Sequence, residues 1–319
     1  MPLIDKPLAE LKEYKGISTQ PTDFDAYWER ALKELAETDP AVELKKSDAL
    51  KLKNTEIFDL YFTGVGGARI YAKVLRPRGA TATPGILVFH GYSGNSGDWM
   101  SHMHLVSEGA TVVAMDCRGQ GGQSEDVGGV KGNTLKGHII RGLDDPDPDK
   151  LLFRQHFLDT VQLVRVVSEF DWVDENRLGC TGGSQGGALS LVCAALSPQI
   201  KRCLSIFPFL SDYRRVWEMD MDKRAYEELA DYFRRFDPLH EREEEIFEKL
   251  AYIDVSLLAP RIKAEVLMGI TLMDITCPPS TQFAAYNNIS SKKSNLIYYD
   301  YGHEGLPGIQ DAGLNFFSE

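Results

Sequence analysis

A serine flanked by glycines, Gly182-Gly183-Ser184-Gln185-Gly186, constrains this 319-residue chain more than any other stretch. Residues 178–181 before it have strand character, and residues 188–196 after it are rich in alanine and leucine, as in a buried helix. Glycine two residues before and two residues after the serine permits a sharp strand-to-helix turn in which a Cβ would clash. The pattern predicts a strained serine suited to nucleophilic attack. The alternative is a serine that only caps the helix.

Short apolar runs alternate with helical segments from residue 85 onward. The runs are rich in Val, Ile, Leu and Tyr and cover residues 85–89, 111–115, 178–181, 202–207, 265–269 and 295–300; helical candidates include 153–170 and 279–288. This alternation predicts an α/β fold with a mostly parallel sheet and helices on both faces. Functional residues in such sheets lie in loops at the carboxyl ends of the strands.

The segments outside this alternation extend a single domain over residues 1–319. Residues 1–55 are expected to form an N-terminal extension, with an aromatic-faced helix over 22–37 that packs on the main domain. A hairpin is predicted for 56–63 and 69–75, before the main sheet. The charged helical insertion over 211–258 is expected to be a solvated cap, a lid over the serine, or both.

Composition excludes several classes of partner. The net charge of −12 argues against nucleic acid and anionic membranes as main partners. The first twelve residues lack an apolar signal-peptide core, and no stretch has the length of a membrane span. The five cysteines are scattered and lack metal-type spacing, which indicates a reducing, cytoplasmic location. We expect no metal and no cofactor.

A histidine and a carboxylate must activate the serine, and the chain offers both after the predicted strands. His303 follows the last predicted strand, and Asp274 follows the strand that ends at residue 269. The order Ser184, Asp274, His303 is that of the α/β-hydrolase fold. Asp300 is a second candidate for the acid, although it lies on the strand next to His303 and is poorly placed to turn back.

An acyl-transfer site also needs two N–H donors for the oxyanion. The fold predicts one from Gln185, directly after the nucleophile, and one from the loop after residues 85–89, where Tyr92 is the best candidate. The Tyr92 ring is also a candidate wall of the substrate pocket, or an aromatic side chain packed on the domain.

These motifs together resemble the acetyl xylan esterase and cephalosporin C deacetylase family (carbohydrate esterase family 7). The matching set is Arg118-Gly119-Gln120, the glycine-flanked serine, Asp274 before Cys277-Pro278-Pro279, and His303-Glu304; the phrases His90-Gly91-Tyr92, 61–64, 209–212 and 283–287 extend the likeness over nearly the whole chain. The resemblance implies a metal-free intracellular serine esterase that removes acetyl groups from short xylo-oligosaccharides and cephalosporin C. It implies Ser184, Asp274 and His303 as the catalytic triad, Tyr92 and Gln185 as oxyanion donors, and a structural role for Arg118 to Gln120.

The resemblance also implies a ring-like hexamer with active sites that face an inner cavity. The long loop over residues 118–150 is then expected to be buried between subunits, and polymeric xylan would be excluded. Two alternatives remain open for the function. One is a lipase or peptidase on the same fold, and the other is a non-catalytic binding protein on a hydrolase scaffold.

Overall fold

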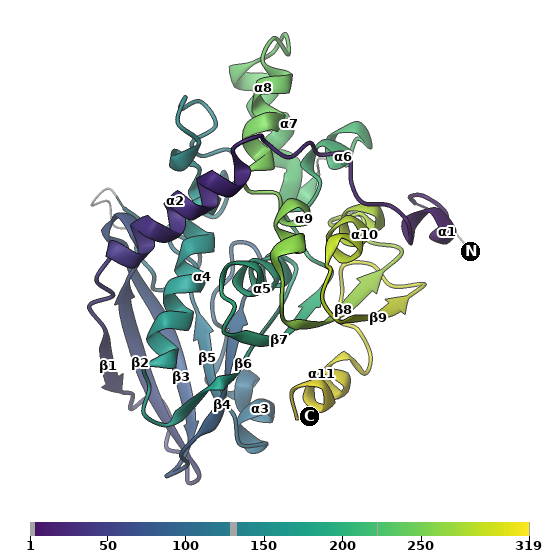
Figure 1. Cartoon of the computed structure of the whole chain (residues 1–319). Helices are drawn as coiled ribbons and strands as arrows, with labels where there is room; N and C mark the ends of the chain where they lie inside the picture. Colours follow the sequence, from purple (N-terminus) through teal and green to yellow (C-terminus); the bar gives the residue numbers. More distant parts are fainter. Residues whose placement is uncertain (1–3, 128–132, 222, 319) are drawn as a thin grey trace.

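The computed structural model describes residues 4–127, 133–221 and 223–318. Strands from these residues form one nine-stranded sheet in the order β1-β2-β3-β5-β4-β6-β7-β8-β9 (Figure 1). Their bounds are β1 Glu43–Lys46, β2 Thr55–Thr63, β3 Arg69–Pro77, β4 Thr83–Phe89, β5 Thr111–Met115, β6 Val173–Gly183, β7 Ile200–Ile206, β8 Glu265–Thr271 and β9 Lys293–Tyr298. The pairings from β5 to β9 are parallel, and those among β1, β2, β3 and β5 are antiparallel. The predicted α/β-hydrolase architecture and its N-terminal hairpin are confirmed.

Helices cover both faces of the sheet because alternate strand residues are apolar on each side. On one face, Leu87 and Val113 join a large core with α4 (Leu152–Ser168) and α5 (Gln185–Leu196). On the other face, Ile86 and Val112 join a second core with α3 (Met103–Ser107), while α11 (Ile309–Ser318) covers β7 and β8. Burial on both faces explains the nearly continuous apolar character of β5.

The N-terminal extension packs on the main domain, as its aromatic helix predicts. In α2 (Phe24–Glu37), Trp28 is fully buried and stacks on Phe157 of α4, with ring centroids 5.9 Å apart. The short strand β1 was not expected from the sequence. Its four residues are mostly exposed, because it is an edge strand held only by β2, so it lacks the apolar alternation that marks a half-buried strand.

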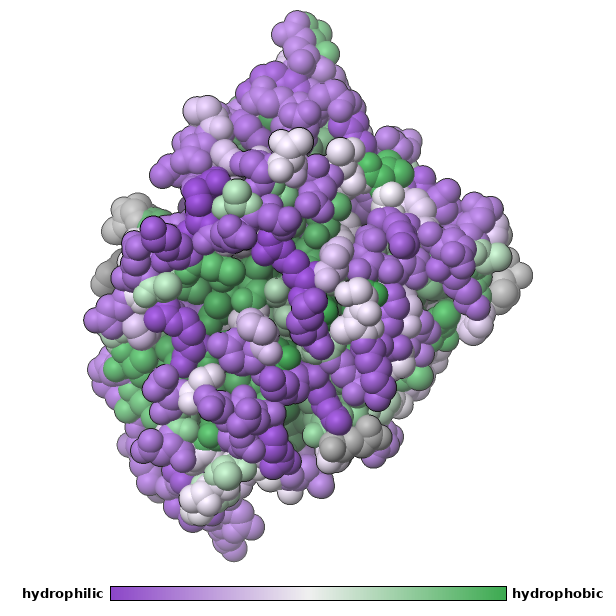
Figure 2. All heavy atoms as spheres, in the orientation of Figure 1, coloured by the Kyte–Doolittle hydropathy of each residue, from purple (hydrophilic) through white to green (hydrophobic). Residues whose placement is uncertain are grey.

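The insertion between β7 and β8 projects from the carboxyl-terminal edge of the sheet (Figure 1). It contains α6 (Tyr213–Glu218), α7 (Glu227–Phe236), α8 (Glu243–Ala251) and α9 (Val255–Leu258). Its projecting end is mainly hydrophilic on the face seen in Figure 2. The remaining short helices are α1 Leu8–Leu11, α10 Pro279–Asn288 and the 3₁₀ turns Val65–Gly67, Trp99–His102, Pro148–Lys150, Arg224–Tyr226 and Ala259–Arg261. None of the helices in the described part of the chain has the length and apolar character needed to cross a bilayer.

Two buried aspartates fasten the N-terminal segment to the insertion. Asp212 accepts hydrogen bonds from the Tyr14 hydroxyl at 2.7 Å and from the backbone N–H of Ser18 at 3.2 Å. Its own N–H donates to Asp254 at 2.9 Å, and Asp254 also accepts from the backbone and hydroxyl of Ser256. Burial, followed by the Asp212 charge, raises the pKa of Asp254 to about 6.

The start of the chain also supports α10, the helix that follows the loop of Asp274. The Asp5 carboxylate accepts the Ser280 N–H in the first turn of α10 at 2.7 Å and pairs with Arg215 of α6 at 2.9 Å. Helix α10 has no side-chain cap of its own, since its N-cap position is Pro278. Asp5 therefore performs the capping role from a distant part of the chain.

Candidate active site

The backbone at Ser184 has the strained turn that the glycine spacing predicts. Ser184 lies between β6 and α5 with φ 58° and ψ −119°, a conformation that non-glycine residues rarely adopt. A Cβ on Gly182 would lie 2.5 Å from the Phe89 carbonyl oxygen, and one on Gly186 would lie 2.1 Å from the same atom. The turn therefore requires glycine at both positions.

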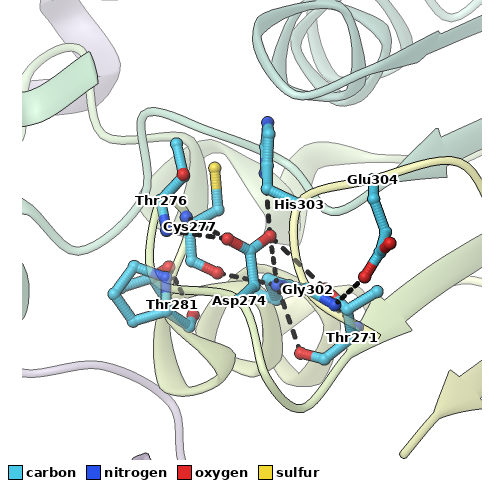
Figure 3. A network of polar contacts seen from close by, with 10 residues as sticks. Thr271, Asp274, Thr276, Cys277, Thr281, Gly302, His303 and Glu304 are labelled. Carbon is cyan, nitrogen blue, oxygen red and sulfur yellow. Dashed lines mark hydrogen bonds and ion pairs between the residues drawn. The ribbon is translucent and has the colours of Figure 1, made fainter. Parts of the chain in front are cut away.

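Asp274 and His303 meet at the carboxyl-terminal edge of the sheet (Figure 3). The loops after β8 and β9 bring Asp274 Oδ2 within 2.8 Å of His303 Nδ1. The Asp274 side chain is fully buried, while the His303 side chain is 23% exposed. The structure brings this predicted acid and base together, and the contact at Nδ1 leaves Nε2 as the nitrogen available to a reacting group.

Short-range hydrogen bonds fix the Asp274 carboxylate. Its Oδ1 accepts the backbone N–H of Thr276 at 2.7 Å and of Cys277 at 2.9 Å, and the Thr271 hydroxyl lies 3.4 Å from Oδ2. These donors hold the carboxylate in one orientation toward His303. The prolines that follow Cys277 stiffen the loop and start α10.

Cys277 is a buried thiol beside the serine and the acid. Its side chain points to the same side of Asp274 as the His303 ring (Figure 3). Burial, followed by the Asp274 charge, raises the pKa of the Cys277 thiol. Within the part of the chain that the structure describes, no hydrogen bond joins the Ser184 hydroxyl to the His303 ring.

Asp274, Cys277 and His303 also form the one group of three potential metal-ligand atoms among the described residues. These atoms lie within 4.8 Å of one another. Hydrogen bonds already engage both Asp274 oxygens and His303 Nδ1, and the raised pKa of Cys277 disfavours its thiolate. The geometry therefore favours an acid–base pair over a metal site.

Ser184 and His303 open into one cleft of about 680 Å³. The loop after β4, the loop around residues 135–140 and the insertion line its walls, and the insertion contributes Arg224, Ala225, Glu227, Glu228, Asp231, Arg235 and Phe236. Lys136 of the long loop pairs with Glu227 of the insertion across the wall. The insertion is thus a wall of the cleft as well as a solvated cap, and charges of both signs line the space.

The two residues expected to supply oxyanion donors flank the serine. Gln185 is the first residue of α5, and Tyr92 lines the cleft from the loop after β4. The Tyr92 ring also packs near Phe209 and Phe153, with centroids 5.6 and 6.5 Å away. It is therefore both a pocket wall and a packed aromatic side chain.

Arg118 and Gln120 make buried contacts around this region, in keeping with the structural role that the family resemblance implies for them. Arg118 forms a buried ion pair with Asp159, with Nε 2.7 Å from Oδ2. The Gln120 and Gln185 side chains exchange two hydrogen bonds, of 2.8 and 3.0 Å. Gln120 also accepts the backbone N–H of Ser93 at 3.0 Å, so it joins the loop of Tyr92 to the start of α5.

Sequence reasoning missed two residues of this site, Glu228 and His138. Glu228 is 4% exposed and lies against the Tyr92 hydroxyl; His138 is fully buried and bonds to Gln120 through Nδ1 at 3.0 Å. Glu228 belongs to a helix rich in both charges, where a buried carboxylate has no distinguishing pattern. His138 is an isolated histidine in a polar stretch, so neither position carried a signal.

The sheet order, the strained serine turn and the Asp274–His303 pair are those of the α/β-hydrolase class of proteins. A family model described as acetyl xylan esterase (AXE1) matches residues 1–319, and the chain belongs to that family. A solved acetyl xylan esterase 1 from Thermoanaerobacterium sp. JW/SL YS485 is 58% identical, with a TM-score of 0.95 and 98% of each chain covered. The acetyl xylan esterase from Paenibacillus sp. R4 is 37% identical, with a TM-score of 0.92 over 98% of this chain and 99% of that chain.

A curated relative is more distant. The acetyl esterase Axe7A of Xylanibacter ruminicola is 29% identical over 294 residues, which cover 89% of this chain. The match spans 63% of that relative's own length.

Proposed function

We propose that the chain is a serine acetylesterase in which Ser184, Asp274 and His303 form the catalytic triad. The observation that carries the proposal is the Asp274–His303 hydrogen bond in the same cleft as the strained Ser184. The family to which the chain belongs supports an acetylated carbohydrate as the substrate.

In the proposed reaction, Ser184 Oγ attacks the acetyl carbonyl carbon while His303 Nε2 takes the hydroxyl proton. Asp274 holds the other ring nitrogen and stabilises the imidazolium that forms. The carbonyl π electrons move to oxygen, and their return expels the alcohol, which receives the proton from His303. Water then attacks the acetyl-serine by the same route and releases acetate. Donation from the backbone N–H groups of Tyr92 and Gln185 would stabilise each oxyanion.

The substrates we propose are acetylated xylo-oligosaccharides and other small acetyl esters, including cephalosporin C. A cleft of about 680 Å³ with both apolar and charged walls fits an oligosaccharide fragment of a few rings. The Tyr92 ring and the insertion line the same cleft as Ser184. If they close the pocket around the acyl group, a short acyl group is favoured.

Kinetics on ester substrates with a common alcohol and increasing acyl length test this proposal. We expect efficient hydrolysis of acetyl esters, poor hydrolysis of butyryl and longer esters, and labelling of Ser184 by a serine-directed phosphonate. A kcat/KM that rises with acyl length would favour the lipase alternative, amide cleavage would favour the peptidase, and absence of turnover would favour a binding protein.

We also propose a closed homo-oligomer, a hexamer by family resemblance, in the cytoplasm. An apolar side chain of the long loop, Val127, is 43% exposed, which suits a surface covered by another subunit. All five cysteines are unpaired, which fits a reducing compartment. Light scattering tests the assembly. A fully active monomer, or equal rates on acetylated polymer and short oligomers, would contradict it.

A further inference from the structure

The Tyr92 hydroxyl group forms hydrogen bonds with two other segments of the chain, helix α7 and the long loop over residues 118–150. Its hydroxyl donates to the Glu228 carboxylate of α7 and accepts the backbone N–H of His138 at 3.2 Å. Tyr92 and Glu228 are 136 positions apart in the sequence. The loop proposed to carry an oxyanion donor is therefore fastened to the insertion and to the long loop through one hydroxyl group.

Glu228 is arranged as an acceptor for several donors. Its Oε1 accepts the Tyr92 hydroxyl and the Gly137 N–H at 3.3 Å, and its Oε2 accepts the N–H groups of Ile139 at 2.7 Å and Ile140 at 3.4 Å. The residue is 4% exposed. Burial raises the pKa of its carboxyl group more than the hydrogen bonds from these donors lower it. A buried carboxylate that needs four donors holds them in one geometry.

The same network reaches the second oxyanion residue. His138, whose N–H meets the Tyr92 hydroxyl, bonds through Nδ1 to Gln120, and Gln120 bonds to both Gln185 and the Ser93 N–H. The residues that flank the expected oxyanion position on both sides thus belong to one connected set. Glu228 is therefore connected to Tyr92 directly, and to Gln185 through Tyr92, His138 and Gln120.

We infer that Glu228 is a positioning residue for the oxyanion hole, which acts through the Tyr92 hydroxyl to hold the Tyr92 N–H in place. This inference rests on the proposed function. It assigns to the insertion a role in the rate of acyl transfer, in addition to its role as a wall of the cleft. Glu228 contacts the ring hydroxyl of Tyr92 and not its backbone. Loss of the Glu228 carboxylate should therefore displace the Tyr92 N–H but leave that donor present.

Two single substitutions in the full-length protein, Tyr92→Phe and Glu228→Gln, test the inference together with their double variant. Tyr92→Phe removes one hydroxyl and keeps the ring and the backbone N–H. Glu228→Gln leaves one oxygen for donors that now occupy two, so at least one donor loses its acceptor. Glu244→Gln is the matched control, because it neutralises a 79% exposed carboxylate of the same insertion that pairs with Arg214.

The readouts are kcat and KM on an aryl acetate, the inhibition constant of an arylboronic acid that forms a tetrahedral serine adduct, and thermal unfolding. Each single variant should lower kcat about 10- to 100-fold, less than the about 10²- to 10³-fold typical of a deleted oxyanion donor. KM should change less than about threefold, and boronate binding should weaken in parallel with kcat. The double variant should be no slower than the slower single variant, since both break one contact.

Unchanged kcat and boronate affinity in folded Tyr92→Phe would overturn the inference, as would losses that multiply in the double variant. If Glu228→Gln does not fold, Tyr92→Phe alone decides the outcome. Failure of the proposed function is distinguished by the unmodified protein, which would then not hydrolyse the aryl acetate or form a boronate adduct.

Discussion

The acid–base side of the cleft is supported by residues close together in the sequence, whereas the oxyanion side is supported by residues far apart. Asp274 is held by the N–H groups two and three positions after it. Tyr92 is held by Glu228, 136 positions away, and Gln185 by Gln120, 65 positions away. The hydrogen bonds to Asp274 form within its own loop. Those to Tyr92 form only after the loop after β4, the loop around residues 135–140 and helix α7 have packed together.

This difference implies that the two sides fail in different ways. A change to Asp274 or His303 alters the proposed acid and base themselves. A change to the oxyanion supports is expected to displace a donor and to leave the donor present. We therefore expect large, uniform losses on the acid–base side and smaller, graded losses on the oxyanion side.

Ser184→Ala should have the largest effect, because the nucleophile serves both sides. We expect kcat for acetyl ester hydrolysis to fall by about 10⁶-fold, as for loss of the serine in other triads. The circular dichroism spectrum and the thermal unfolding curve should match those of the unmodified protein. The substitution keeps Gly182 and Gly186, on which the backbone turn depends. Substantial activity in the folded variant would remove the proposed triad.

Asp274→Asn tests the acid–base side alone. The amide presents an N–H₂ group either to His303 or to the backbone donors of Thr276 and Cys277, so the ring loses its orientation and tautomer. We expect kcat to fall by about 10⁴-fold with little change in KM. A loss of less than about tenfold, together with a large loss in Asp300→Asn, would transfer the role of the acid to Asp300.

The Asp212–Asp254 pair tests whether the insertion can be loosened without touching either side of the site. The pKa of Asp254 is raised from 3.8 to about 6, so the folded protein binds its proton more tightly than the unfolded chain. The stability that this group contributes is therefore fully present below about pH 4 and is lost as the pH rises through about 6. The full difference corresponds to about 3 kcal/mol.

Urea unfolding of the unmodified protein and Asp254→Asn between pH 4 and 7 measures this contribution. The free energy of unfolding of the unmodified protein should decline relative to the variant as the pH rises. A difference between the two proteins that stays constant with pH would show that Asp254 titrates as an ordinary carboxyl group in the fold.

Gln120→Ala should have the smallest effect on rate, because it removes a support of the oxyanion side and no reacting group. The Gln185 side chain and the Ser93 N–H lose a buried partner. We expect kcat to fall about tenfold in the folded protein, and stability to fall by about 1–3 kcal/mol. A loss as large as that of Asp274→Asn would erase the distinction between the two sides.

The same distinction explains what the sequence could and could not predict. The glycine spacing around Ser184, the order of Asp274 and His303, and the apolar strands are local patterns with a physical cause that a sequence displays. The burial of Glu228 depends on how the insertion folds over two distant loops. The residues next to Glu228 in the sequence therefore do not indicate that its side chain is buried. The edge strand β1 has no buried face and was missed for a related reason.

The contact between Asp5 and α10 bears on the order in which the protein opens on heating. A segment that joins the rest of the fold through a small number of side-chain contacts can open locally at a lower free-energy cost than the core. Release of Asp5 leaves the Ser280 N–H without its acceptor at the start of the helix that anchors the Asp274 loop. Catalytic activity should therefore decline a few degrees below the main unfolding transition, and hydrogen exchange at Ser280 should rise over the same interval.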